Sequence, residues 1–248
     1  MRTPVMAGNW KMYKTPAETK AFFEAFRPLV AKVTDREIVI CPPFTNLEAA
    51  AGAVKGTRIG IGAQNLYWAK EGAFTGEISA RMIVGCGCSH VIIGHSERRQ
   101  YFGETDETVL QKTVAALEAG LTPIVCVGER LEHREAGQTE AVLRGQVKNG
   151  IGGLTPEQFA KIVIAYEPVW AIGTGKTATP EIAEDAHRVI RAEVRAKFGA
   201  AADAVRILYG GSVKPDNTKT LMSKEEIDGV LVGGAALDAA SFGAIVNY

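Results

Sequence analysis

The stretch Lys161-Ile162-Val163-Ile164-Ala165-Tyr166 is a short run rich in β-branched residues, and it ends in one carboxylate, Glu167. Its apolar residues do not alternate with polar ones, which is typical of a strand covered on both faces, as in a parallel sheet whose crossover connections are helices. After an intervening loop, Pro180–Phe198 has helical periodicity behind a capping Thr179. This part of the chain therefore predicts one strand–loop–helix unit.

Seven further runs of the same kind predict strands along the 248 residues. The eight together are Val5–Asn9, Glu37–Cys41, Arg58–Ala63, His90–Gly94, Thr122–Val127, Lys161–Tyr166, Arg206–Gly210 and Gly229–Val232. Helical periodicity lies between them, as in Ala17–Lys32, Thr105–Ala119, Glu140–Lys148, Pro180–Phe198 and Pro215–Met222. Strands that alternate with helices imply parallel pairing through right-handed crossovers.

The number of units favours a closed sheet. Eight βα units in 248 residues match an α/β fold with a closed eight-stranded parallel (β/α)8 barrel better than an open, doubly wound sheet. An open sheet that binds nucleotides needs a Gly-x-Gly-x-x-Gly first turn, and residues 60–65 lack its third glycine. No linker or change of composition divides the chain, so we expect a single domain over residues 1–248.

Several helix starts are marked by capping residues. Thr15-Pro16-Ala17-Glu18 combines a capping threonine, a proline at the first helical position and a glutamate at the spacing of a capping box. Ser223-Lys224-Glu225-Glu226 has the same box spacing and predicts a further helix start.

The composition excludes some classes of partner. Lys+Arg and Asp+Glu are equal at 28 each, so the chain offers no electrostatic footprint for nucleic acid or for an anionic membrane. No segment has the pattern of a signal peptide or a membrane span. The four cysteines are Cys41, Cys86, Cys88 and Cys126, without a C-x-x-C pair, which favours free thiols in the cytoplasm over disulfides or a zinc site. We expect neither a metal nor a cofactor.

Polar residues collect where the predicted strands end, which is the catalytic face of such a barrel. They are Asn9 and Lys11 after the first strand, His95 and Glu97 after the fourth, Glu167 after the sixth, Gly210-Gly211-Ser212 after the seventh and Gly233-Gly234 after the eighth. Taken singly, Lys11 has the alternative of a surface lysine, His95 that of a core histidine, and Glu97 that of a surface partner for Arg98 or Arg99. Their shared location favours a site, and the last two loops favour a phosphate.

Glu167 and the loop behind it predict a general base beside an anion-binding lid. Burial at a strand end removes competing water and raises a carboxyl pKa, which suits a base. The loop begins with Pro168-Val169-Trp170 and ends with Gly173-Thr174-Gly175-Lys176-Thr177, so it can move as a unit and offer N–H groups to an anion. Its end is similar to a P-loop, but Trp170 stands where that motif needs its first glycine, so no ATP site is predicted.

The long loop after the third strand carries aromatic residues in Leu66-Tyr67-Trp68 and in Gly72-Ala73-Phe74-Thr75-Gly76-Glu77. An exposed Phe between glycines indicates either a folded-back loop or a docking tip. We expect this loop to contact a second subunit.

These motifs together resemble the triosephosphate isomerase family. The resemblance is carried by Gly8-Asn9-Trp10-Lys11-Met12, Gly62-Ala63-Gln64-Asn65, Gly72–Ser79, Ile93–Arg99, Cys126-Val127-Gly128-Glu129, Ala165–Thr177, Tyr209-Gly210-Gly211-Ser212 and Leu231-Val232-Gly233-Gly234. It implies a TIM barrel that acts in glycolysis and gluconeogenesis. Its reaction would interconvert dihydroxyacetone phosphate and D-glyceraldehyde 3-phosphate through an enediolate, without a cofactor.

The resemblance also implies a role for each matching residue. Glu167 would move the proton, His95 would polarise the carbonyl as a neutral imidazole, and Lys11 would stabilise the enediolate. Asn9 would bind substrate oxygens, and Glu97 would assist near Lys11. Gly173, Ser212, Gly233 and Gly234 would hold the phosphate, and Thr75 would brace the partner's site in a homodimer. Two alternatives are a Schiff-base aldolase, for which Lys11 is the only lysine at a strand end, and a non-catalytic barrel used as a scaffold.

Overall fold

The computed structural model describes residues 2–172 and 178–248, and in them eight parallel strands close into a barrel. The strands are β1 (Val5–Asn9), β2 (Glu37–Cys41), β3 (Ile59–Ala63), β4 (His90–Ile93), β5 (Thr122–Val127), β6 (Val163–Tyr166), β7 (Arg206–Tyr209) and β8 (Gly229–Val232). Each pairs with its neighbours in the sequence, and β1 pairs with β8 to close the ring. The predicted barrel is therefore confirmed, and the eight predicted runs match the strands to within two residues at each end.

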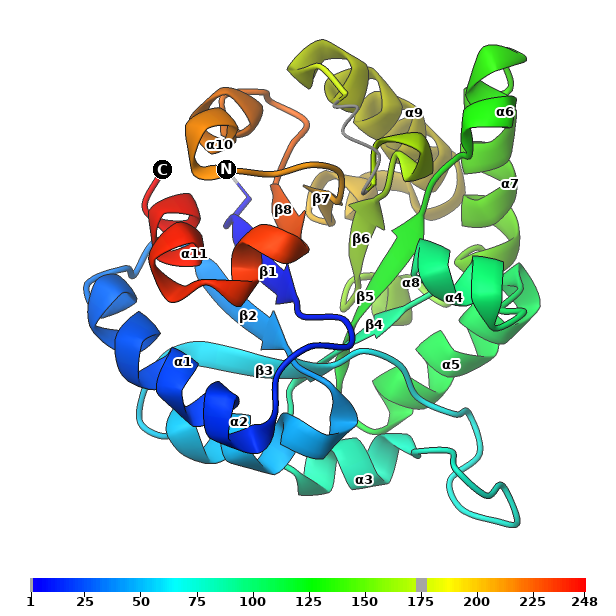
Figure 1. The fold of residues 1–248 in the computed structure, drawn as a ribbon. Coiled ribbons are helices and arrows are strands. Elements are labelled where there is room, and N and C mark those ends of the chain that lie inside the picture. Colours follow the sequence, from blue (N-terminus) through cyan, green and yellow to red (C-terminus); the bar gives the residue numbers. More distant parts are fainter. Residues whose placement is uncertain (1, 173–177) are drawn as a thin grey trace.

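Helices surround the barrel in the described residues, as Figure 1 shows. They are α1 (Pro16–Val30), α2 (Leu47–Ala53), α3 (Ala80–Gly85), α4 (Ser96–Tyr101), α5 (Asp106–Glu118), α6 (Leu131–Glu135), α7 (Thr139–Gly150), α8 (Pro156–Phe159), α9 (Pro180–Phe198), α10 (Pro215–Met222) and α11 (Ala239–Val246). Short 3-10 helices are η1 (Phe44–Asn46), η2 (Val169–Ala171), η3 (Gly199–Asp203) and η4 (Gly234–Leu237).

The capping signals were right in two cases and wrong in one. Thr15 and Glu18 form the predicted capping box at the start of α1, and the Thr179 side chain accepts a hydrogen bond from the backbone N–H of Ile182 at the start of α9. Ser223 does not start a helix. It is the C-cap of α10, and its hydroxyl donates backwards to the carbonyl of Thr220. A box spacing predicts a helix only where the preceding helix has already ended.

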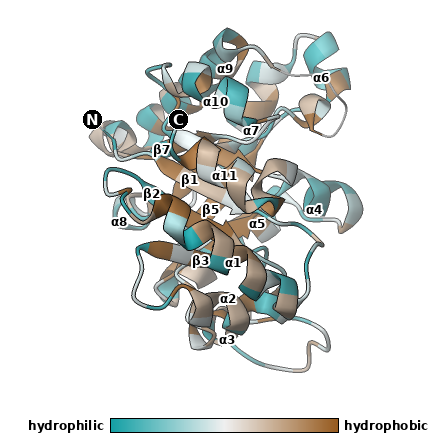
Figure 2. Cartoon of the chain, turned by 60° about the vertical axis from the view of Figure 1, so that its left-hand side comes forward, coloured by the Kyte–Doolittle hydropathy of each residue, from teal (hydrophilic) through white to brown (hydrophobic). Residues whose placement is uncertain are grey.

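Two apolar layers hold the fold together. One fills the barrel interior and consists of Val5, Ala7, Val39, Cys41, Ile92, Ile124, Cys126, Val163, Ala165, Leu208 and Leu231. The larger layer lies between the strands and the helices, so both faces of each strand are covered. Figure 2 shows this arrangement as hydrophobic strands at the centre and more hydrophilic helices outside.

Candidate active site

Strand periodicity directs two of the predicted side chains to the mouth of the barrel. Successive residues of a strand point to opposite faces. Val163 and Ala165 belong to the interior layer, so Glu167, two residues on, continues on the same face. Val5 and Ala7 place Asn9 in the same way at the end of β1. Glu167 and Asn9 therefore meet at the carboxyl ends of the strands because of their register.

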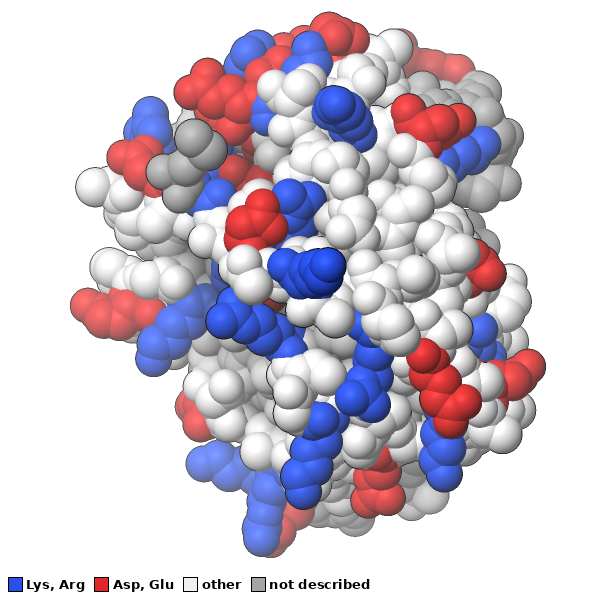
Figure 3. Space-filling view, turned by 90° about the vertical axis from the view of Figure 1, so that its left-hand side faces the viewer, with Lys and Arg blue, Asp and Glu red and all other residues white. Residues whose placement is uncertain are grey.

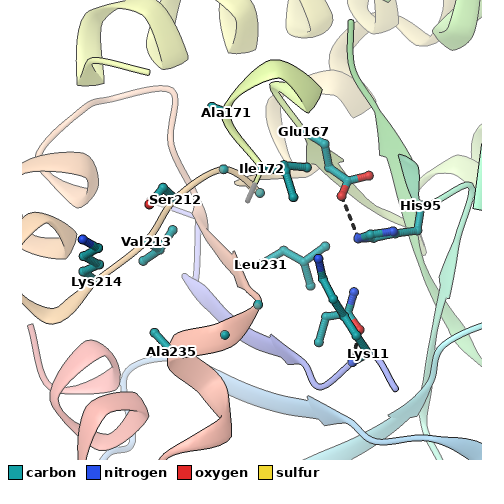
Figure 4. Close-up of a pocket in the computed structure, with 15 residues that line it drawn as sticks. Lys11, His95, Glu167, Ala171, Ile172, Ser212, Val213, Lys214, Leu231 and Ala235 are labelled. Carbon is teal, nitrogen blue, oxygen red and sulfur yellow. Dashed lines mark hydrogen bonds and ion pairs between the residues drawn. The ribbon is translucent and has the colours of Figure 1, made fainter. Parts of the chain in front are cut away.

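His95 reaches the same place through a turn that only glycine adopts easily. Gly94 has φ of +75°, and a Cβ there would lie 2.9 Å from Val109 and 3.1 Å from the carbonyl oxygen of Cys126. This turn swings His95 over the mouth, where its Nε2 lies 2.8 Å from Oε1 of Glu167. Figure 4 shows that the two side chains face each other at the edge of the cavity.

The protonation state of His95 follows from its second nitrogen. Nδ1 accepts a hydrogen bond from the backbone N–H of Glu97 at 3.2 Å, so it carries a lone pair and the proton is on Nε2. Burial lowers the pKa of His95, but the adjacent Glu167 carboxylate outweighs it and raises that pKa. The ring in this geometry is a neutral donor aimed at the carboxylate.

Glu167 is buried, with 2% of its surface exposed, and its carboxylate is held by three donors. Besides His95, the backbone N–H of Ser96 donates to Oε2 at 2.9 Å and the Ser96 hydroxyl to Oε1 at 3.3 Å. Burial alone raises the pKa of this carboxyl, as the sequence predicted. His95, the N–H of Ser96 and the charge of Lys11 reverse the effect, so the pKa is lowered. The expected raised pKa was wrong because these partners come from other strand ends.

Lys11 has an unusual backbone conformation that neighbouring side chains hold in place. Its φ is +52°, which is uncommon for a residue with a side chain. The Asn9 side chain accepts from the N–H of Lys11 at 3.0 Å, and the Gln64 amide donates to its carbonyl at 2.9 Å. The Lys11 ammonium lies 2.6 Å from the Glu97 carboxylate.

A cavity of about 290 Å³ joins these residues to the loops after β7 and β8. Its lining includes Asn9, Lys11, His95 and Glu167. It also includes Gly210, Gly211, Ser212, Lys214, Gly233 and Gly234 from the loops after β7 and β8. The structure thus brings together the predicted residues of both groups, whereas Gly173 lies outside the described residues. The sequence indicated no role for Lys214, which lines this cavity, or for Ser96 and Gln64, which hold Glu167 and Lys11 in place.

Glu97 and Thr75 lie apart from this cavity. Glu97 lines an adjoining one of about 200 Å³, which shares Asn9, Lys11 and His95 and opens toward Met12, Phe44 and Phe102. Thr75 is exposed in the loop between β3 and α3, which projects from the body of the molecule in Figure 1.

The described residues offer neither a metal site nor a membrane-spanning helix. No group of three or more His, Cys, Asp or Glu side chains in them is arranged to hold a metal ion. None of their helices has the length and hydropathy needed to cross a membrane.

Known proteins match the chain over its whole length. The triosephosphate isomerase family model matches residues 4–248. The triosephosphate isomerase of Solibacter usitatus is 76% identical over 249 residues, covering all of both chains, and that of Citrifermentans bemidjiense is 59% identical, covering 100% of this chain and 99% of the relative. The crystal structure of triosephosphate isomerase from Bartonella henselae has a TM-score of 0.90 at 39% identity, covering 99% of this chain and 98% of that one. The chain belongs to the triosephosphate isomerase family.

Proposed function

We propose that this protein interconverts dihydroxyacetone phosphate and D-glyceraldehyde 3-phosphate in the cytoplasm, as a step of glycolysis and gluconeogenesis. The observation that carries the proposal is the 2.8 Å contact between a buried carboxylate and a neutral imidazole in a cavity floored by glycine turns. The exchange of an aldose and a ketose needs one base that reaches two neighbouring carbons and one donor that reaches two neighbouring oxygens. Glu167 and His95 supply that pair.

The contact between the two side chains indicates how a substrate would enter the reaction. The Nε2 proton of His95 points at Glu167. A substrate carbonyl oxygen that accepts a hydrogen bond from Nε2 would therefore replace Glu167 as the partner of His95. Glu167 then gives up donors that lower its pKa, and a carboxylate that loses hydrogen bonds in a buried site becomes a stronger base. Its oxygen removes the proton from the carbon beside the carbonyl and returns it to the neighbouring carbon.

Two groups would stabilise the negative charge that develops on the enediolate oxygens. His95 donates from Nε2 to either oxygen, and Lys11 supplies a positive charge at the same side of the cavity. Asn9, which already orients the backbone of Lys11, binds the substrate oxygens, and Glu97 fixes the Lys11 ammonium.

The phosphate is assigned to the part of the cavity formed by the loops after β7 and β8. Ser212, Gly233 and Gly234 come from the loops after β7 and β8, which line the cavity. Loops at this place in such a barrel commonly bind phosphate through backbone N–H groups. Gly173, which the sequence places in the lid, would add one more backbone donor. Closing a lid over the enediolate would exclude water and prevent loss of phosphate.

We also propose that the protein forms a homodimer. Exposed apolar side chains near the cavity and in the projecting loop support this. Met12 is 92% exposed and Phe102 67% exposed, and both line the cavity that adjoins Lys11 and Glu97. Phe74, beside Thr75 in the projecting loop, is 44% exposed. Insertion of a partner's loop into this cavity would bury both sets of apolar surface and place Thr75 near the Lys11–Glu97 pair.

An assay in deuterated water tests the proposal and separates it from the alternatives. Purified protein given D-glyceraldehyde 3-phosphate is expected to produce dihydroxyacetone phosphate, with solvent deuterium entering the product because the enediolate exchanges its proton. A Schiff-base aldolase would instead be inactivated by borohydride in the presence of substrate. Absence of any conversion would leave the barrel as a scaffold and would contradict the proposal.

A further inference from the structure

The charge balance of the cavity is unfavourable for a phosphorylated triose. Its charged lining in the described residues consists of Lys11, Glu167 and Lys214. The Lys11 ammonium is already paired with Glu97. With a neutral His95, the group of Lys11, Glu97 and Glu167 carries a net negative charge, which repels a phosphate dianion. A second cation at this cavity would offset that repulsion.

Lys214 is placed to be that cation. It follows Ser212 and Val213 in the loop after β7, and its side chain is exposed. Figure 4 shows it on the other side of the cavity from His95 and Glu167, beside the residues assigned to the phosphate. Within residues 2–172 and 178–248, no hydrogen bond or ion pair involves its ammonium group. Its charge is therefore available to a ligand.

The choice of a lysine at this position works against the local structure. Lys214 is the N-cap of α10, where Ser, Thr, Asp or Asn is preferred. Its backbone N–H donates to the Asn217 side chain at 2.8 Å, which is one half of a capping box. An ammonium group has no acceptor to complete the other half, and its positive charge opposes the dipole of the helix. Residues that break a local rule in this way are often kept for function.

The net charge of the chain does not take over this role. The chain has equal numbers of acidic and basic residues, and Figure 3 shows them interspersed on the face that carries α1 and α11. A balanced surface provides no long-range field for an anion, so attraction depends on charges at the cavity itself.

We propose that Lys214 is a positioning residue that draws the phosphate of the triose toward Ser212, Gly233 and Gly234. The inference rests on the proposed isomerase function and concerns substrate capture, not the proton transfer. Lys214 acts from the rim, so it accelerates encounter and orients the substrate, while Glu167 and His95 determine the rate of the bound complex.

The variant Lys214→Ser tests this role because it removes the charge and completes the capping box. We expect kcat/KM to fall about fivefold at low ionic strength and less than about twofold at 0.5 M salt, where exposed charges are screened. We expect kcat to stay within about twofold, and Tm to rise by about 2 °C because the cap is improved. Lys214→Arg should retain the kcat/KM of the parent protein. Lys219→Ser is the matched control, because it removes the same charge from α10 outside the cavity lining.

Each outcome decides for or against the inference. A drop in kcat/KM that shrinks with salt, absent from Lys219→Ser and restored by Lys214→Arg, supports it. Unchanged kcat/KM in Lys214→Ser, an equal drop in Lys219→Ser, or a drop independent of salt would overturn it while the isomerase function stands. An inactive parent protein would instead overturn the proposed function itself.

Discussion

One histidine begins strand β4 and another follows shortly after its end, and both histidines contact a glutamate. After its carboxyl end, His95 Nε2 lies 2.8 Å from Glu167, and at its first residue, His90 Nε2 lies 2.9 Å from Glu37. The two pairs sit at opposite ends of one barrel and have nearly the same contact distance. Only the first lines the cavity that also holds Lys11 and the glycine turns after β7 and β8.

The partners of the two glutamates explain the difference. Glu37 lies between His90 and the guanidinium of Arg206 on β7, a permanent cation. The close contact with His90 and the charge of Arg206 outweigh burial, so the pKa of Glu37 is lowered to about 2. Glu167 is held by Ser96 and a neutral ring, donors that a substrate can replace. We therefore expect the same pair of side chains to be structural where a permanent charge holds it and reactive where its partners can be exchanged.

Replacing Glu167, the proposed base, is expected to have the largest effect. Glu167→Gln should lower kcat by roughly 10²–10⁴-fold, because the amide cannot accept the proton, while glycerol 3-phosphate still binds. Glu37→Gln is the matched control at the other end of the barrel, with kcat expected within about threefold of the parent. Steady-state kinetics and ligand titration measure both. Near-normal turnover in Glu167→Gln would show that another group is the base.

The end of the barrel that holds the proposed active site is also the end that we expect to depend on a partner chain. Thr75→Arg places a bulky charge at the projecting loop, so we expect sedimentation to show monomers and kcat to fall by about tenfold or more, because Lys11 and Glu97 lose the covering loop. Thr139→Arg, on α7, is a control. A monomer with full activity would contradict the role assigned to Thr75.

Removing one hydrogen bond to Glu167 is expected to change the pKa of its carboxyl group. Ser96→Ala removes the hydroxyl donor but keeps the backbone N–H, so the pKa of Glu167 should rise. The acid limb of the pH profile of kcat/KM should then move to higher pH, with a loss of up to about tenfold at neutral pH. An acid limb at the position of the parent protein would mean that the hydroxyl does not stabilise the carboxylate.

Changing Glu37, in the pair with His90, is expected to have the smallest effect and to change stability alone. Because the folded pKa of Glu37 lies near 2 and the ordinary value is 4.5, its stabilisation is present above about pH 4.5 and is lost as the pH falls toward 2. Glu37→Gln should cost about 2 kcal/mol at pH 7 and should flatten the dependence of stability on pH in that window. Denaturant unfolding from pH 7 to pH 3 measures this. Parallel pH curves for the two proteins would argue against the assignment.

The sequence predicted the barrel and the meeting of Asn9, His95 and Glu167, since hydrophobic runs and strand ends are local signals. It did not predict contacts between distant segments. The bond from Ser96 to Glu167 spans 71 residues, and no local pattern encodes it. The pKa of Glu167 was predicted in the wrong direction for the same reason. The failed helix start at Ser223 shows that a spacing must be interpreted with its context.

The left-handed backbone of Lys11 has a consequence for how activity appears during folding. The side chain that holds its carbonyl, Gln64, follows β3, and the same amide also donates to the carbonyl of Cys41 at the end of β2. A partly folded barrel made of β4 to β8 would contain His95 and Glu167, but Gln64 would not yet be in place to hydrogen-bond the carbonyl of Lys11. Turnover should therefore return only when the first three strands have joined the ring, later than any signal from the helices.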